Sequence, residues 1–359
     1  MTITRVLLTA LFTVVTTLDL VLCKPALAGL PLGNAVKDPY AILRTALPIE
    51  QKDLRELQYK LESTSDLVRG NRWPSVNKAS TRAQFLVSNR KNQILESIPK
   101  ANKKEAEEII NLLRNDLTEL GELSSDKDKY GFIEKRRKSL EKIGKLESLL
   151  LSNKFPYSIP SEYENLPRLL GRATVSIKTS KGNMNAIIDG YNAPITSGNF
   201  IDLVLKGFYD GLPFTRAEDF YVLQTGDPKG PDIGYINPET KEERHIPLEI
   251  RIPEKEETIY NQTFEEMGLY TETPVLPFAT LGTLGWAHSN EALDDGSSQF
   301  FFFLYEAELN PAGKNLIDGR NAAFGYVVDG AEILNDLSVD DEIISIKVID
   351  GKDLLKDHG

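Results

Sequence analysis

The chain has 359 residues, of which 41% are hydrophobic and 26% charged, with 42 Lys and Arg against 53 Asp and Glu. This balance excludes disordered, collagen-like and polytopic membrane chains, and the length predicts two domains. The formal net charge of −11 argues against nucleic acid as a partner, because that affinity depends on Lys and Arg neutralising phosphates.

The N-terminus has the pattern of an export signal. Arg5 precedes an apolar run over 6–22, and a small-residue cleavage pattern follows at 26–28. We expect cleavage after Ala28, which would deliver the chain to a thylakoid lumen or a periplasm, peripheral to the membrane at most. A retained anchor is the alternative, but Asp19 within the run would be costly in lipid.

Cleavage would also remove the only cysteine, Cys23, whose preceding Leu22 argues against a lipoprotein site. Disulfides, thiol catalysis and cysteine-bound zinc are then excluded. Three histidines remain, His245, His288 and His358. They are too few and too scattered to predict a metal site.

Charge divides the chain into two unlike parts, because residues 29–170 carry a net charge of +5 and residues 171–359 one of −17. We therefore predict a helical domain over 29–155, a proline-rich linker over 156–170 and a second domain over 171–359. Complementary charge suggests that the two domains dock. The basic run 135–138 is either part of that contact or a solvated helix face.

Apolar residues in the first part recur at spacings of three and four, which predicts amphipathic helices. Four such stripes with short connections predict an antiparallel four-helix bundle, with a polar turn at 124–128. The members that define the stripes are Leu54, Leu57, Leu61, Val68, Phe85, Leu86, Ile94, Leu95, Ile98, Ile109, Leu112, Leu113, Leu117, Leu120, Phe132, Ile133, Leu140, Ile143, Leu146 and Leu150.

The second part alternates short strand patterns with turn signals. Residues 174–178 alternate with a period of two, 181–183 form a turn, and 184–188 return as a second strand. A short helix is predicted from Pro194, ending at Gly207. Many short strands with one or two helices predict a closed β-barrel with flanking helices.

Six ordered segments then resemble the signature blocks of the cyclophilins. They are NAPITSGNF at 192–200, YDG at 209–211, FTR at 214–216, QTGDP at 224–228, GSSQFF at 296–301 and LIDGRNAAFG at 316–325. The helical part, with DPYAIL at 38–43 and ALPI at 46–49, is similar to the large thylakoid-lumen cyclophilins of chloroplasts and their bacterial relatives.

The resemblance implies an eight-stranded barrel that isomerises peptidyl-prolyl bonds of proline-containing polypeptides without a cofactor or metal. It assigns Arg216 as the catalytic arginine, and gives Gln224 the role of holding the substrate carbonyl or orienting Arg216. The resemblance also implies a substrate pocket. Its expected lining is Phe214, Tyr221, Val222, Ala287, His288, Gln299, Phe301, Leu316, Asn321 and Phe324.

Several positions depart from the family pattern. Thr215 and Asn321 stand where histidines are typical, Leu316 replaces a rim tryptophan, and Trp286 replaces a methionine. Losing the tryptophan puts cyclosporin binding in doubt. An added segment at 251–277 is expected to form a loop or short helix that covers the pocket or faces a partner.

Two functions follow from these observations. One is an exported prolyl isomerase that assists folding, assembly or maintenance of photosystem II, with photosystem II proteins among its partners. The other is an assembly scaffold with weak or no catalysis, in which the barrel is a binding module gated by the helical domain.

Overall fold

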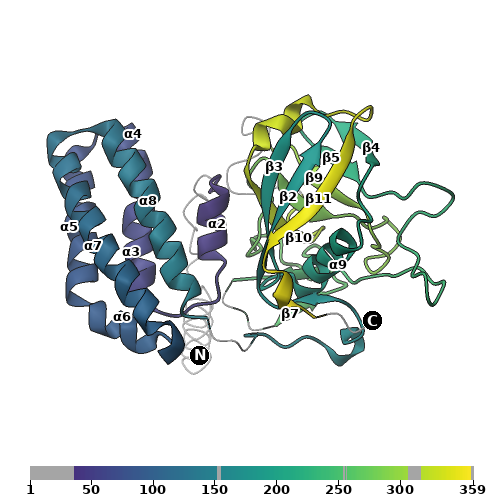
Figure 1. Ribbon diagram of the computed structural model, residues 1–359, viewed down its shortest axis with the longest axis horizontal. Helices are drawn as coiled ribbons and strands as arrows, with labels where there is room; N and C mark the ends of the chain where they lie inside the picture. The colour runs from purple at the N-terminus through teal and green to yellow at the C-terminus, as the bar shows by residue number, and fades with distance from the viewer. Residues whose placement is uncertain (1–35, 152–154, 254, 256, 306–316, 357–359) are drawn as a thin grey trace, which may run out of the picture. The chain divides into compact units, whose positions relative to one another are not determined.

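The computed structural model describes residues 36–151, 155–253, 255, 257–305 and 317–356 (Figure 1). The expected export signal and its cleavage site lie outside these residues. Within the described ranges, no helix is long and apolar enough to cross a membrane.

The first part of the described chain is helical. Its helices are α2 (Pro39–Thr45), α3 (Lys52–Glu62), α4 (Thr64–Arg69), α5 (Trp73–Asn89), α6 (Lys91–Ser97), α7 (Lys103–Asp126) and α8 (Lys129–Ser148). Side chains cap three of them: Asp38 accepts from the Tyr40 amide of α2, Gln51 from the Leu54 amide of α3, and Asp128 from the Gly131 amide of α8. Such caps satisfy amides that have no partner within the helix.

The long helices α3, α5, α7 and α8 form the predicted four-helix bundle. α3 packs on α5 and α8, and α7 packs on α5 and α8. The apolar stripes meet in a core that contains Leu57, Leu113, Leu120, Phe132 and Leu146, all fully buried. The expected turn at 124–128 is shorter than predicted, because α7 continues to Asp126 with Ser124 buried against its neighbours.

The second part forms a closed barrel of eight strands in the order β10-β3-β2-β11-β4-β5-β9-β8, as predicted. The strands are β2 (Arg172–Thr179), β3 (Asn183–Asp189), β4 (Leu212–Glu218), β5 (Val222–Thr225), β8 (Thr283–Trp286), β9 (Phe300–Phe303), β10 (Ala323–Asp329) and β11 (Glu342–Asp350). Helix α9 (Pro194–Leu205) packs near β11, and β1 (Arg168–Leu169) pairs with β12 (Leu355–Lys356).

Alternation along the strands separates an interior from an outer face. On β9, Phe300 and Phe302 belong to the barrel interior, while Phe301 and Phe303 belong to a separate apolar cluster on the outer face. Within the added segment at 251–277, expected to be a loop or short helix, Arg251 and 258–260 belong to a two-stranded hairpin, β6 (Glu249–Arg251) with β7 (Thr258–Tyr260). Residues 261–277 form a loop.

Helix α2 differs from the expectation that the whole helical part would share one bundle. Its residues Ile42 and Leu43, and Ala46 that follows it, are buried in the outer-face cluster of the barrel. None of the three appears in the bundle core. We call the segment 38–47 the α2 strap.

Candidate functional site

A β-bulge in β4 determines which way the arginine of the FTR motif points. Phe214 pairs with Thr225 of β5, but Arg216 pairs with Gln224, so Thr215 is an extra residue in the ladder. Without this insertion, Phe214 and Arg216 would share a face. The bulge sends Phe214 into the barrel interior and leaves Arg216 exposed on the outer face.

The strand register places the candidate polar residues in one row on the outer face. Arg216 lies opposite Gln224, and Gln224 lies opposite Phe301. The Gln224 side-chain amide donates to Gln299 Oε1 at 2.8 Å, and the Gln299 amide donates to the Ile233 carbonyl at 3.0 Å. These bonds hold both glutamines in place. Arg216 forms an ion pair with exposed Glu218 at 2.7 Å and is itself about half exposed, with 48% of its side-chain surface open to solvent.

Apolar side chains flank this row. Val222 and Phe301 are 3% and 5% exposed, whereas Tyr221 is 41% exposed and takes the Arg216 guanidinium over its ring at 5.7 Å. Two residues that the sequence did not single out belong to the same cluster, Ile317 and Phe278, whose ring stacks on Phe301 at 5.8 Å. Ile317 lies within the LIDGRNAAFG block, so its neighbourhood could have indicated it.

Two of the expected pocket residues do not reach the outer face. Phe214 and Phe324 are at most 1% exposed and belong to the barrel interior, where the Phe324 ring lies 5.2 Å from Phe200. This placement corrects the expectation that they line the pocket.

The remaining expected residues sit at the edge of the row. The Ala287 amide donates to the Gln299 carbonyl, and Asn321 Nδ2 donates to the Trp286 carbonyl at 3.0 Å. The His288 ring lies between two backbone carbonyls, those of Ser289 at 2.7 Å and Arg320 at 3.0 Å. Leu316 lies outside the described residues. In the parts of the chain that the structure describes, no cluster of His, Cys, Asp and Glu could hold a metal ion.

Comparison with known families matches both parts of the chain. Residues 174–349 match the cyclophilin-type peptidyl-prolyl cis-trans isomerase family, and residues 38–151 match the PsbQ-like domain of CYP38-like peptidyl-prolyl cis-trans isomerases. A putative thylakoid lumen peptidyl-prolyl cis-trans isomerase of Synechocystis is 48% identical over 94% of this chain and 89% of its own length. The chain belongs to the cyclophilin family of peptidyl-prolyl cis-trans isomerases.

Two chloroplast cyclophilins of Arabidopsis thaliana share the same arrangement of matched sequence. CYP38 is 39% identical over 91% of this chain and 77% of its own length. CYP37 is 30% identical over 87% of this chain and 69% of its own length. The resemblance that the sequence motifs indicated therefore extends across both the helical part and the barrel.

Barrel residues of this cyclophilin donate hydrogen bonds to backbone carbonyls of the α2 strap. Arg172 donates to the Leu43 carbonyl at 2.6 Å, and Asn192 Nδ2 donates to the Ala46 carbonyl at 3.0 Å. Buried Asp189 holds both donors, with Arg172 at 2.6 Å and the Asn192 amide groups at 3.1 and 3.2 Å. The carbonyls at the end of a helix lack partners within it, so these donors complete its hydrogen bonding.

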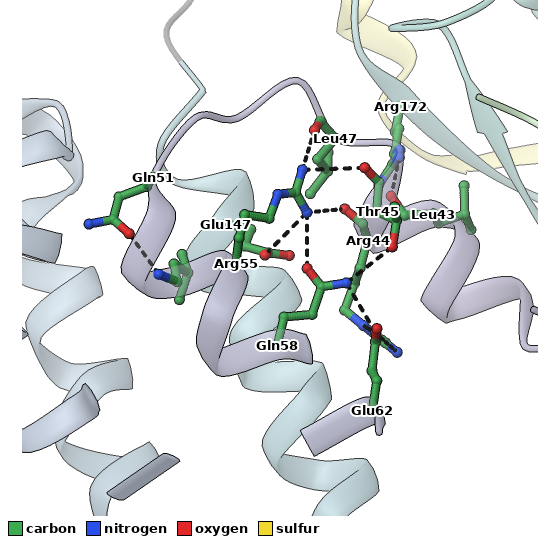
Figure 2. Close-up of polar contacts among 11 residues, drawn as sticks. Leu43, Arg44, Thr45, Leu47, Gln51, Arg55, Gln58, Glu62, Glu147 and Arg172 are labelled. Carbon is green, nitrogen blue, oxygen red and sulfur yellow. Dashed lines mark hydrogen bonds and ion pairs between the residues drawn. The ribbon is translucent and has the colours of Figure 1, made fainter. Parts of the chain in front are cut away.

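A residue of the bundle also donates hydrogen bonds to carbonyls of the strap. Arg55 of α3 donates to the carbonyls of Arg44 at 2.8 Å and Leu47 at 2.5 Å (Figure 2). Glu147 of α8 lies 3.4 Å from the same guanidinium and has no exposed side-chain surface. Burial raises the pKa of Glu147 to about 8, against the opposing effect of Arg55 and Arg44.

The raised pKa of Glu147 predicts that the bundle loses stability as pH rises. The unfolded carboxyl ionises near 4.5 and the folded one near 8, so the folded state binds more protons throughout that window. We expect the free energy of unfolding, followed by helical circular dichroism, to fall between these two pH values and to level off above them. Glu147→Gln should flatten this slope, and an unchanged slope in the variant would contradict the assignment.

Three members of the basic run at 135–138 form ion pairs inside the bundle rather than with the barrel. Lys135 pairs with Asp116 and Glu119, and Arg137 and Lys138 pair with Glu134. All these partners lie within the bundle. The described contacts between bundle, strap and barrel include hydrogen bonds from arginine and asparagine side chains to strap carbonyls, an ion pair between Arg44 of the strap and Glu62 of α3 at 3.0 Å, and apolar packing.

Proposed function

We propose that this cyclophilin isomerises X-Pro bonds of polypeptides on the outer face of the barrel, with Arg216 as the catalytic residue. The observation that carries the proposal is the bulge at Thr215, which brings an exposed guanidinium into one row with Gln224 and Phe301. Isomerisation needs only a group that favours the twisted amide, because no covalent intermediate forms.

The chemistry suits this arrangement. The barrier to rotation is about 18–20 kcal/mol because the planar amide has partial double-bond character. In the twisted state the prolyl nitrogen becomes pyramidal and accepts a hydrogen bond, which a permanently charged guanidinium donates well. Val222, Phe301 and Ile317 would contact the proline ring, and Gln224 and Gln299 would hold the flanking backbone.

The test of this proposal is the exchange rate between cis and trans forms of a short X-Pro peptide, measured by nuclear magnetic resonance with and without the chain from residue 29. Uncatalysed exchange takes tens to hundreds of seconds, so acceleration is readily detected. No acceleration by a chain shown to be folded would overturn the enzymatic proposal and leave the barrel as a binding module.

We further propose export to a thylakoid lumen and participation in the assembly or maintenance of photosystem II. Support comes from the expected export signal, from the thylakoid lumen relative and from the PsbQ-like description of the matched helical domain. Sedimentation of the chain with isolated photosystem II membranes tests the partner. Fractionation of cells that express the full chain tests the compartment.

A second candidate function is a binding module whose site the α2 strap restricts. It is favoured by one observation: Ile42 and Leu43 of the strap share a buried cluster with Val222 and Phe301, which flank Arg216. Exposing those residues would then require the strap to leave.

Release of the strap should raise catalysis if this restriction operates. Replacing both Ile42 and Leu43 by Asp removes the apolar contact, so we expect kcat/KM for an X-Pro peptide to increase about fivefold or more, because the competent population grows. A double variant of exposed residues, Tyr59→Asp with Leu112→Asp, serves as the control. Equal rates in the parent chain and the strap variant would exclude gating.

A further inference from the structure

The turn between β4 and β5 holds an aromatic residue in a conformation that bulky side chains rarely adopt. Phe220 has φ = +60°, in the left-handed region where a bulky residue is an outlier and its backbone is strained. Its side chain is also 59% exposed. The backbone strain at this position is therefore not offset by burial of the Phe220 ring.

The other non-glycine residues with positive φ in the described chain differ in kind. They are Asn71, Lys127, Lys241 and Asn261, which are polar. Asparagine in particular tolerates this region. The turn as formed has Phe220 as its left-handed third residue, and Tyr221 donates its amide to the Glu218 carbonyl at 3.0 Å across it. Glycine or asparagine would adopt this conformation at lower cost, so the phenylalanine is not explained by the turn.

The position of Phe220 relative to the candidate site suggests what its ring does. It directly precedes Tyr221, whose ring stacks under the Arg216 guanidinium and lies edge-on to Phe303 at 6.4 Å. Tyr221 also accepts the Leu304 amide at 2.8 Å, at the far end of β9 from Gln299. Phe220 therefore extends the site at the end opposite Gln299.

We propose that Phe220 and Tyr221 form an aromatic shelf that selects a large apolar side chain immediately after the proline of the client. The inference rests on the proposed function, in which Gln299 holds backbone that flanks the proline, and it assigns to Gln299 the backbone on the N-terminal side. An extended client that passes Gln299 and then Arg216 next reaches the Tyr221 end of β9. Contact with an apolar client residue buries the exposed Phe220 ring, which stabilises that complex over one with alanine at the same position.

The test compares peptides X-Pro-Y in which Y is Phe, Ala, Arg or Glu, with the parent chain and Phe220→Asn. For the parent we expect kcat/KM with Phe to exceed that with Ala about 5- to 10-fold. In Phe220→Asn that ratio should fall toward 1, while the urea midpoint rises because strain is relieved. The exposed Tyr130 of the bundle provides the control, and Tyr130→Asn should leave the ratio unchanged.

Three results would overturn the shelf: a Phe-to-Ala ratio that survives in Phe220→Asn, a variant that slows all four peptides equally, or a parent that prefers Arg. Peptide dissociation constants, measured by chemical-shift titration, distinguish failure of the proposed isomerase function from failure of the aromatic shelf. If no peptide is isomerised, tighter binding of the Phe peptide that disappears in Phe220→Asn still supports the shelf, and equal binding of the Phe and Ala peptides refutes it.

Discussion

Arg216→Ala should reduce kcat/KM for X-Pro peptides by about 100- to 1,000-fold, the loss typical of removing one donor aimed at a transition state. The effect should fall on kcat more than on KM. In the planar ground state the prolyl nitrogen accepts no hydrogen bond, so the substitution removes an interaction that forms only in the transition state. Rates of cis-to-trans exchange over a range of peptide concentrations separate the two constants.

Arg216→Lys tests the geometry of the same interaction. Lysine keeps the positive charge but not the planar fork of donors, so we expect it to recover only part of the loss. Arg69→Ala, a change to an exposed arginine of the bundle paired with Asp66, is the control for a general effect of charge. A rate for Arg216→Ala within threefold of the parent would show that the catalytic group lies elsewhere.

The second large effect is expected from Asp189→Ala. The carboxylate is fully buried, 2.6 Å from Arg172, and accepts from both amide groups of Asn192. Removing one partner of a buried pair typically costs about 3–5 kcal/mol, and Arg172 keeps some solvent contact. We therefore expect the free energy of unfolding of the barrel to fall by about 3 kcal/mol.

Fluorescence of Trp286 reports the barrel in a Trp73→Phe background, because the chain has two tryptophans, Trp73 and Trp286. Asp189→Asn keeps the shape of the side chain and one acceptor oxygen, so it should cost less than Asp189→Ala. The two substitutions should also accelerate proteolysis of the strap, since Arg172 and Asn192 lose their support. Wild-type stability in Asp189→Ala would mean that Arg172 holds the strap without this carboxylate.

Sequence periodicity predicted most of the fold because both domains bury regular patterns. The stripes led by Leu57 and Leu113 specify one face of a helix, and the β2–β3 hairpin follows from alternation around 181–183. The placement of the α2 strap was not predicted, because the strap is too short to show such a pattern. Seven helical residues contain too little pattern to show whether Ile42 and Leu43 face helices or a barrel.

The candidate site was predictable in its residue types but not in its orientations. The FTR and QTGDP blocks indicated Arg216 and Gln224, which the register places side by side. Whether Phe214 faces inward depends on the bulge at Thr215, and no local signal in the sequence marks a bulge there. The stacking of Phe278 on Phe301 depends on a contact between segments that only the folded barrel brings together.

The fastening of the α2 strap also orders events during synthesis. The strap leaves the ribosome before the bundle, yet its barrel donors Arg172 and Asn192 follow 129 and 146 residues after the carbonyls they bind. Its bundle donor, Arg55, follows only 11 residues after Arg44. The nascent chain thus completes the near attachment long before the distant one exists. During that interval Ile42 and Leu43 have no completed barrel cluster in which to be buried.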